Sequence, residues 1–174
     1  MEHQIMIERL REHVSDGQMR EIVDMIVKQY RNYLGNMYNL NAANLFREEY
    51  ASHYRQYCIS WAIISAFESG SIVAGDLQVK KIEYGRGHNR PELSNNKIKI
   101  HILSSEINLN ANYLQKDYEC NKNNFSNEQL CCIIRYNTKR GRLNSITLCL
   151  PDETGQIIET EKLLDRNKIL KYVA

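Results

Sequence analysis

The chain contains little proline and glycine, with two prolines and eight glycines among 174 residues. It therefore has no Pro- or Gly-rich linker that would separate a second module. No stretch approaches the roughly 20 apolar residues that a membrane-spanning helix needs, so we expect no membrane partner. The first residues lack the basic region and apolar core of a signal peptide, which predicts a cytoplasmic protein.

The sequence also lacks the cysteine and histidine spacing of a metal site. Its five cysteines form an odd number, and none belongs to a Cys-x-x-Cys or Cys/His pair with zinc-ligand spacing. We therefore expect reduced thiols in a core, and neither a metal nor another cofactor. The net charge of only +2 is far from that of a dedicated nucleic-acid module, so any such binding must depend on local basic patches.

The first part of the chain has the apolar period of helices. Apolar residues three and four positions apart predict a helix over 18–34, with Asp16 as its N-cap and Gly35 at its end. A longer helix is predicted over 42–68, and residues 2–14 carry a weaker helical pattern. The buried stripe of the longer helix is predicted to consist of Phe46, Tyr50, Tyr54, Tyr57, Trp61 and Ile64.

Beyond residue 75 the apolar period changes from 3.6 to 2, which indicates strands. In 97–102 the alternation predicts that Ile98, Ile100 and Ile102 face inward and that Lys97, Lys99 and His101 face outward. The adjacent Lys80 and Lys81 interrupt the alternation of their strand, which indicates an edge strand or a bulge. Because hairpins connect several of these segments, we expect an antiparallel sheet. The segment 104–128 fits either a helix or a strand, and we favour a strand followed by a loop. Strands are predicted at 76–84, 97–102, 130–136, 143–150 and, more briefly, 156–159.

These elements predict one α+β domain over 1–174. It is mainly helical in 1–70 and mainly strands in 71–159, and it ends with a helix in 160–174 that Thr160 caps. We expect the N-terminal helices and the C-terminal helix to pack on one face of an antiparallel sheet of four to six strands.

Two basic segments are candidates for anion or nucleic-acid binding. The first lies around Gly85 and Gly87, whose backbone can approach a phosphate closely, and the second is a turn containing Gly141. At the same end of the sheet they would form one basic rim suited to nucleic acid or to an acidic protein surface. The simpler alternative is two solvated hairpin loops. The candidate residues are Lys80, Lys81, Arg86, His88, Arg90, Lys139, Arg140 and Arg142.

A third candidate is the pair Arg47 and His53, which are separated by five residues on the longer helix. The pair resembles the Arg-x(4–6)-His motif of the helical HEPN ribonucleases. The resemblance implies a histidine that moves the 2′-hydroxyl proton and an arginine that stabilises the phosphorane. The rest of the chain is too rich in strand for an all-helical fold, and a structural role for both residues is the alternative.

The sequence contains no complete catalytic motif, so we favour a non-catalytic function. The first hypothesis is a small cytoplasmic binding or regulatory protein that engages nucleic acid or an acidic protein through its basic loops. The second is a metal-independent ribonuclease that uses His53 or His88 with nearby arginines, such as Arg47 for His53. The third is an interaction module that inhibits or assembles with an enzyme through its tyrosine-rich helical part.

Overall fold

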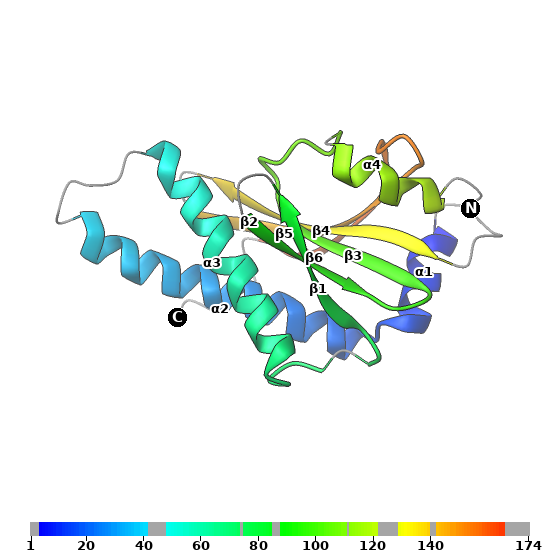
Figure 1. Ribbon diagram of the computed structural model, residues 1–174, viewed down its shortest axis with the longest axis horizontal. Helices are drawn as coiled ribbons and strands as arrows, with labels where there is room; N and C mark the ends of the chain where they lie inside the picture. Colours follow the sequence, from blue (N-terminus) through cyan, green and yellow to red (C-terminus); the bar gives the residue numbers. More distant parts are fainter. Residues whose placement is uncertain are drawn as a thin grey trace.

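The computed structural model describes residues 4–41, 48–73, 75–84, 88–110, 112–121, 129–139 and 142–165. Its helices are α1 (Gln4–His13), α2 (Asp16–Asn41), α3 (Glu48–Glu68) and α4 (Asn112–Tyr118), which the 3-10 helix η1 (Glu119–Asn121) follows. Its strands are β1 (Gln78–Tyr84), β2 (His88–Ser94), β3 (Ile98–Ser104), β4 (Leu130–Lys139), β5 (Arg142–Pro151) and β6 (Ile157–Leu164). The α+β class is therefore confirmed (Figure 1). None of the described helices is long and apolar enough to cross a membrane.

The six strands form one sheet in the order in which they occur along the chain. Four of the five neighbouring pairs are antiparallel, but β3 and β4 are parallel. The expectation of a purely antiparallel sheet is therefore wrong. A parallel pair needs a crossover connection, and the segment that holds α4 provides it, which also corrects the expected strand there. The edge position expected for β1 is confirmed.

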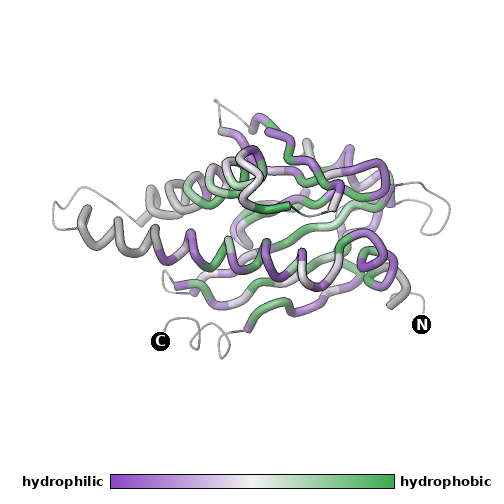
Figure 2. Tube along the Cα trace, turned by 90° about the horizontal axis from the view of Figure 1, so that it is seen from below, coloured by the Kyte–Doolittle hydropathy of each residue, from purple (hydrophilic) through white to green (hydrophobic). Residues whose placement is uncertain are grey.

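Alternation along β3 separates two apolar clusters. Ile98, Ile100 and Ile102 belong to the larger cluster, together with buried residues of α1, α2 and α3. Leu103 belongs to a smaller cluster that contains Leu114 of α4. Helices therefore pack on both faces of the sheet, not on one, and we call these the helical side and the α4 side. Figure 2 shows hydrophobic and hydrophilic residues following one another along the strands.

Helix α2 begins with a capping box. Ser15 Oγ accepts a hydrogen bond from Gln18 N at 3.2 Å, and Gln18 Oε1 accepts one from Ser15 N at 2.8 Å. The N-cap is therefore Ser15 and not Asp16, which is the first helical residue. Gly35 does not end the helix, because α2 continues to Asn41.

The aromatic stripe predicted for α3 is wrong at two positions. Tyr57 and Trp61 are 53% and 61% exposed, whereas Ile59 and Ile63 are almost fully buried. The last turns of α3 are apolar on nearly all sides, so the sequence does not define which stripe faces inward. The compact aliphatic side chains fill the core between α3, α2 and the sheet, and these two aromatic rings remain outside.

The expected C-terminal helix is also wrong where the structure describes it. Residues 160–164 belong to β6, which pairs with β5 from Ile157 to Leu164, and residues 166–174 lie outside the described residues. Glu161, Lys162, Leu163 and Leu164 are good helix formers, but pairing with β5 overrides this local preference. Strand β2 was expected to be a loop, and Pro91 explains why. Its missing N–H is tolerated because β2 pairs with β3 only over residues 92–94.

Candidate functional site

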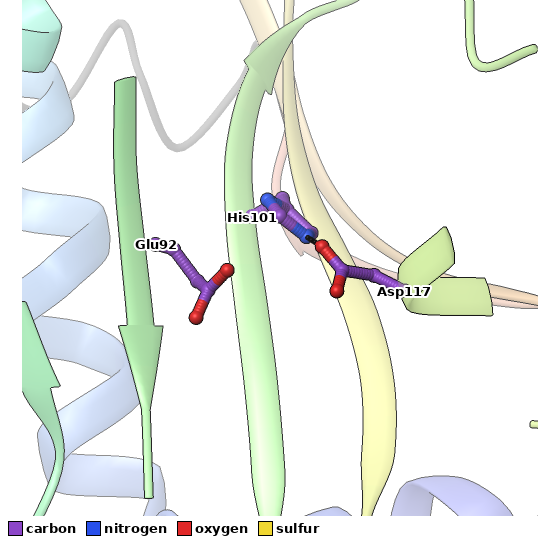
Figure 3. A group of neighbouring side chains, drawn as sticks. All are labelled: Glu92, His101 and Asp117. Atoms are coloured by element: carbon purple, nitrogen blue, oxygen red, sulfur yellow. Dashed lines mark hydrogen bonds and ion pairs between the residues drawn. The ribbon is translucent and has the colours of Figure 1, made fainter. Parts of the chain in front are cut away.

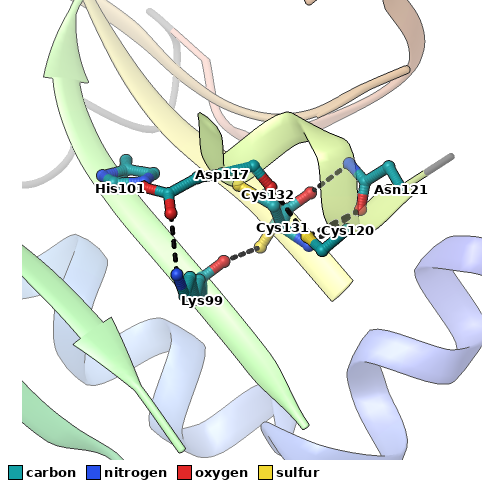
Figure 4. A network of polar contacts seen from close by, with 7 residues as sticks. All are labelled: Lys99, His101, Asp117, Cys120, Asn121, Cys131 and Cys132. Atoms are coloured by element: carbon teal, nitrogen blue, oxygen red, sulfur yellow. Dashed lines mark hydrogen bonds and ion pairs between the residues drawn. The ribbon is translucent and has the colours of Figure 1, made fainter. Parts of the chain in front are cut away.

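A group of polar side chains lies on the α4 side of the sheet, where the strands would otherwise carry apolar residues. Register places Glu92 of β2 opposite His101 of β3, and Ser94 opposite Lys99, so all four share one side. Asp117 of α4 contacts them from above the sheet (Figure 4). We call these five residues the α4-side cluster.

Asp117 joins the two polar residues of β3. Its Oδ1 accepts a hydrogen bond from Lys99 Nζ at 2.7 Å, and its Oδ2 lies 2.9 Å from His101 Nε2. Burial acts to raise the pKa of Asp117, but the hydrogen bonds from His101 and Lys99 outweigh it and hold this pKa below its ordinary value. An ionised Asp117 can only accept, so Nε2 of the buried His101 carries the hydrogen.

The pKa of Lys99 changes in the opposite direction. Burial acts to lower it, yet the hydrogen bond to Asp117 and the nearby charges raise it above the ordinary value. One of those charges is Glu92. Both members of the Lys99–Asp117 pair are therefore charged over the whole physiological range.

Glu92 is the exceptional member of the cluster. Only 3% of it is exposed, and it forms no hydrogen bond or ion pair with any described residue. A carboxylate oxygen of Glu92, a ring nitrogen of His101 and a carboxylate oxygen of Asp117 all lie within 4.8 Å of one another (Figure 3). Ser94 Oγ, in the same cluster, is buried without a hydrogen-bond partner. Buried polar groups of this kind are costly unless a ligand or water satisfies them.

The chemistry available to this cluster is of two kinds. A histidine held by a carboxylate can move a proton, provided that a substrate reaches it. An imidazole nitrogen and two carboxylate oxygens can also hold a divalent metal ion. The unpartnered carboxylate of Glu92 contributes to the second role, because it adds a negative charge without adding a proton donor.

Beside the cluster, Asn121 of η1 connects three segments of the chain. Its side-chain nitrogen donates to Cys131 O at 2.9 Å and to Pro151 O at 2.7 Å, and its oxygen accepts from Cys131 N at 2.9 Å. Asn121 is almost completely buried. It thereby holds the end of the crossover segment against β4 and β5, which positions Asp117 over β3 (Figure 4).

None of the cysteines, which all lie within the described ranges, forms a disulfide. A hydrogen bond with Cys131 lowers the pKa of Cys120, which is half-buried. The same contact and burial raise the pKa of Cys131, and burial raises that of Cys132. Cys120 is therefore the most acidic thiol of this group, and its Sγ donates to Asp117 O at 2.8 Å.

The structure divides the predicted basic residues between the two sides of the sheet. Lys80 is exposed and pairs with Glu92, so it lies on the α4 side, and Arg90 occupies the same side by alternation along β2. Lys81 lies on the helical side, where its Nζ is 2.7 Å from Glu68 Oε1 of α3. Lys81 therefore has a structural partner and is removed from the candidate surface.

The second basic segment belongs to the same side and end of the sheet as the first. Lys139 of β4 and Arg142 of β5 lie opposite each other, and both are exposed. Alternation along β4 from Ile133, which lies on the α4 side, places Lys139 on the same side, and Arg142 lies there with it. Strands β1 and β4 run in the same direction, so their ends, at Tyr84 and Lys139, lie at one end of the sheet. Arg86 and Arg140 lie outside the described residues.

The residues of the ribonuclease hypothesis are not brought together by the described structure. Arg47 lies outside the described residues, and His53 belongs to α3, which packs on the helical side. His88 is the first residue of β2. The structure describes neither histidine side chain, so the hypothesis remains a prediction.

A cavity of about 450 Å³ lies between α1, α2 and the β5–β6 edge. Three of its charged groups compensate one another, because Arg11 pairs with Asp16 at 3.5 Å and with Glu161. Asp24 also lines the cavity, and its Oδ1 is buried without a hydrogen-bond partner. We place the candidate site at the α4-side cluster because that cluster brings a histidine together with two carboxylates.

Sequence reasoning did not find the α4-side cluster. It placed Lys99 and His101 on the outward face of their strand, which is correct, but it expected solvent there and not α4. The alternation of Lys99 and His101 with three isoleucines was the available signal. Comparison of the chain with protein-family models, with curated proteins and with solved structures found no match, so this geometry is the basis for a function.

Proposed function

We propose that this chain is a cytoplasmic nucleic-acid-binding protein that holds a phosphate backbone against the α4 side of its sheet. The observation that supports it is the strand pairing, which gathers basic residues far apart in the sequence on one side. Lys80, Lys139 and Arg142 are exposed there, and Arg90 lies between them.

The dimensions of this surface fit the proposed ligand. Neighbouring strands are about 4.8 Å apart, so β1 and the β4–β5 hairpin are separated by roughly 14–19 Å. That separation spans several phosphates of one nucleic-acid strand. Lysine and arginine bind phosphate by charge-assisted hydrogen bonds, which carry no sequence information. The expected binding is therefore sensitive to salt and tolerant of sequence.

The test compares two variants that lose the same charge on different sides of the sheet. One is Lys80→Ala/Lys139→Ala/Arg142→Ala on the α4 side. The matched control is Arg20→Ala/Lys28→Ala/Arg31→Ala, three exposed residues of α2. Binding to short fluorescent single-stranded RNA and duplex DNA is measured by anisotropy over a range of salt concentrations.

We expect the α4-side variant to lose affinity and to reduce the slope of log affinity against log salt by about 2. The α2 variant should lose much less, because it changes only the net charge. Equal losses in both variants would indicate nonspecific attraction and would contradict the proposal. Failure of the wild-type protein to bind either nucleic acid at low salt would also contradict it.

A protein-interaction function is a second candidate, and exposure of Tyr57 and Trp61 on α3 favours it. Large exposed aromatic side chains are typical of the centres of protein interfaces. A stoichiometric partner that co-purifies in high salt and after nuclease treatment, and that is lost on Trp61→Ala, would support this candidate. Co-purification that Trp61→Ala does not change would reject it.

A further inference from the structure

The α4-side cluster presents three metal-binding groups in one place. Glu92, His101 and Asp117 come from three elements that pairing and packing bring together, namely β2, β3 and α4. Their ligand atoms lie within 4.8 Å of one another, and all three residues are buried or half-buried. Glu92 supplies a second, independent observation, because this residue is only 3% exposed, forms no hydrogen bond or ion pair within the described ranges, and is directed towards the other two residues (Figure 3).

We propose that Glu92, His101 and Asp117 form a binding site for a first-row divalent cation of the Zn²⁺ and Mn²⁺ class. This site goes beyond the proposed nucleic-acid binding and does not depend on it. One imidazole and two carboxylates suit Zn²⁺ or Mn²⁺ better than Mg²⁺, which prefers oxygen ligands alone. Three protein ligands leave at least one coordination position for water or another small ligand, as in catalytic zinc sites.

The site must open slightly to admit the ion. Two ligands about 2.1 Å from a tetrahedral metal are about 3.4 Å apart. His101 Nε2 and Asp117 Oδ2 are 2.9 Å apart in their hydrogen bond, and Glu92 offers a carboxylate oxygen within 4.8 Å of the ligand atoms of both residues. On binding, the cation replaces the hydrogen on Nε2, and the neutral imidazole carries its proton on Nδ1.

The charges around the cluster leave room for a cation. Within the cluster two carboxylates face Lys99, and the exposed Lys80 lies opposite Glu92 on the neighbouring strand. Lys99 Nζ donates a hydrogen bond to Asp117 Oδ1, whereas the proposed cation binds Asp117 Oδ2. Lys99 can therefore keep Asp117 in place while the cation binds, although its positive charge weakens the affinity.

The experiment uses the full-length protein after treatment with chelator and dialysis. Zn²⁺, Mn²⁺ and Mg²⁺ are titrated separately by calorimetry, and thermal unfolding is followed with and without each ion. We expect one site per chain with affinity in the order Zn²⁺, Mn²⁺, Mg²⁺. At a hundredfold excess over Kd, Zn²⁺ should raise Tm by roughly 5–10 °C.

Glu92→Gln is the decisive variant, because it keeps the shape of the side chain and removes the unpartnered charge. Without metal its Tm should equal or exceed that of the wild type, yet its affinity for Zn²⁺ and Mn²⁺ should fall about tenfold or more. The matched control Glu83→Gln, on an exposed residue of the adjacent strand β1, should bind both ions as the wild type does.

Three results would overturn the proposal. The first is a wild-type protein that binds neither Zn²⁺ nor Mn²⁺. The second is binding that Glu92→Gln leaves unchanged. The third is binding that Cys120→Ser abolishes and Glu92→Gln does not, because the ion would then be held by thiols.

Discussion

The two sides of the sheet differ in what they bury, and strand β3 shows the difference within seven residues. On the helical side, Ile98, Ile100 and Ile102 pack among the aliphatic residues of α1, α2 and α3. On the α4 side, the same strand presents Lys99 and His101 to Asp117. One side therefore supplies most of the apolar burial that stabilises the fold. The other buries polar groups that cost stability, which is the pattern of a functional site.

The largest effect should come from truncation on the helical side. Ile100 is completely buried in the larger cluster, so Ile100→Ala should destabilise the protein by about 3–4 kcal/mol. On the α4 side, Leu109 is only partly buried, so Leu109→Ala should cost about 1 kcal/mol. Urea unfolding of the two variants tests the comparison, and equal losses would show that both sides stabilise the fold alike.

Asn121→Ala should give the next effect, about 2–3 kcal/mol, because it leaves the N–H of Cys131 and the carbonyl of Pro151 without their partner. The control is Asn110→Ala, since Asn110 is exposed. The same unfolding measurement applies to both. A loss below 0.5 kcal/mol, the size of an ordinary surface substitution, would mean that Asn121 does not fix the crossover segment.

Substitution of two glycines with positive φ separates the effect of steric crowding on stability from that of backbone strain. Gly155 has φ +87°, and a Cβ there would lie 2.7 Å from Tyr118 Cε2 of α4. Gly70 has φ +70° with nothing within 4 Å. Gly70→Ala should cost about 1 kcal/mol through its φ alone, and Gly155→Ala about 1 kcal/mol more. Equal Tm values for the two variants would show that α4 yields to the added methyl group.

The smallest effect concerns reactivity and leaves the fold intact. Cys120 is half-buried with a lowered pKa, whereas burial raises the pKa of Cys132 and the contact with Cys120 raises that of Cys131. Iodoacetamide should therefore modify Cys120 before the other two thiols, as judged by peptide mass spectrometry at neutral pH. Prior modification of Cys131 would show that the α4 side opens readily, and prior modification of Cys132 that the helical side does.

Local patterns predicted the elements whose sequence and packing agree. The isoleucine alternation of β3 and the apolar period of α2 both appear in the structure, because each element buries one clear face. The sequence patterns predicted the wrong secondary structure where pairing with a neighbouring strand determines it. Residues 160–164 form a strand beside β5 where a helix was predicted, and β2, which contains Pro91, forms where no strand was predicted.

The candidate site lies on two segments whose structure the sequence did not predict. Glu92 lies on β2, which was not predicted as a strand, and Asp117 lies on a helix in a segment where a strand was favoured. Neither residue is near His101 in the sequence, so only the pairing of β2 with β3 and the packing of α4 reveal the cluster. The basic residues were found from composition, but their common side required the strand order.

The central claim is that ligands bind the α4 side and that the helical side is structural. The most direct test is to map amide chemical shifts of isotope-labelled protein during titration with a short single-stranded RNA at low salt. We predict that shifts concentrate on β1, β2 and the β4–β5 hairpin, around Lys80, Arg90 and Lys139, and spare α1 and α2. Shifts concentrated on α1 and α2, or no shifts at all, would contradict the claim.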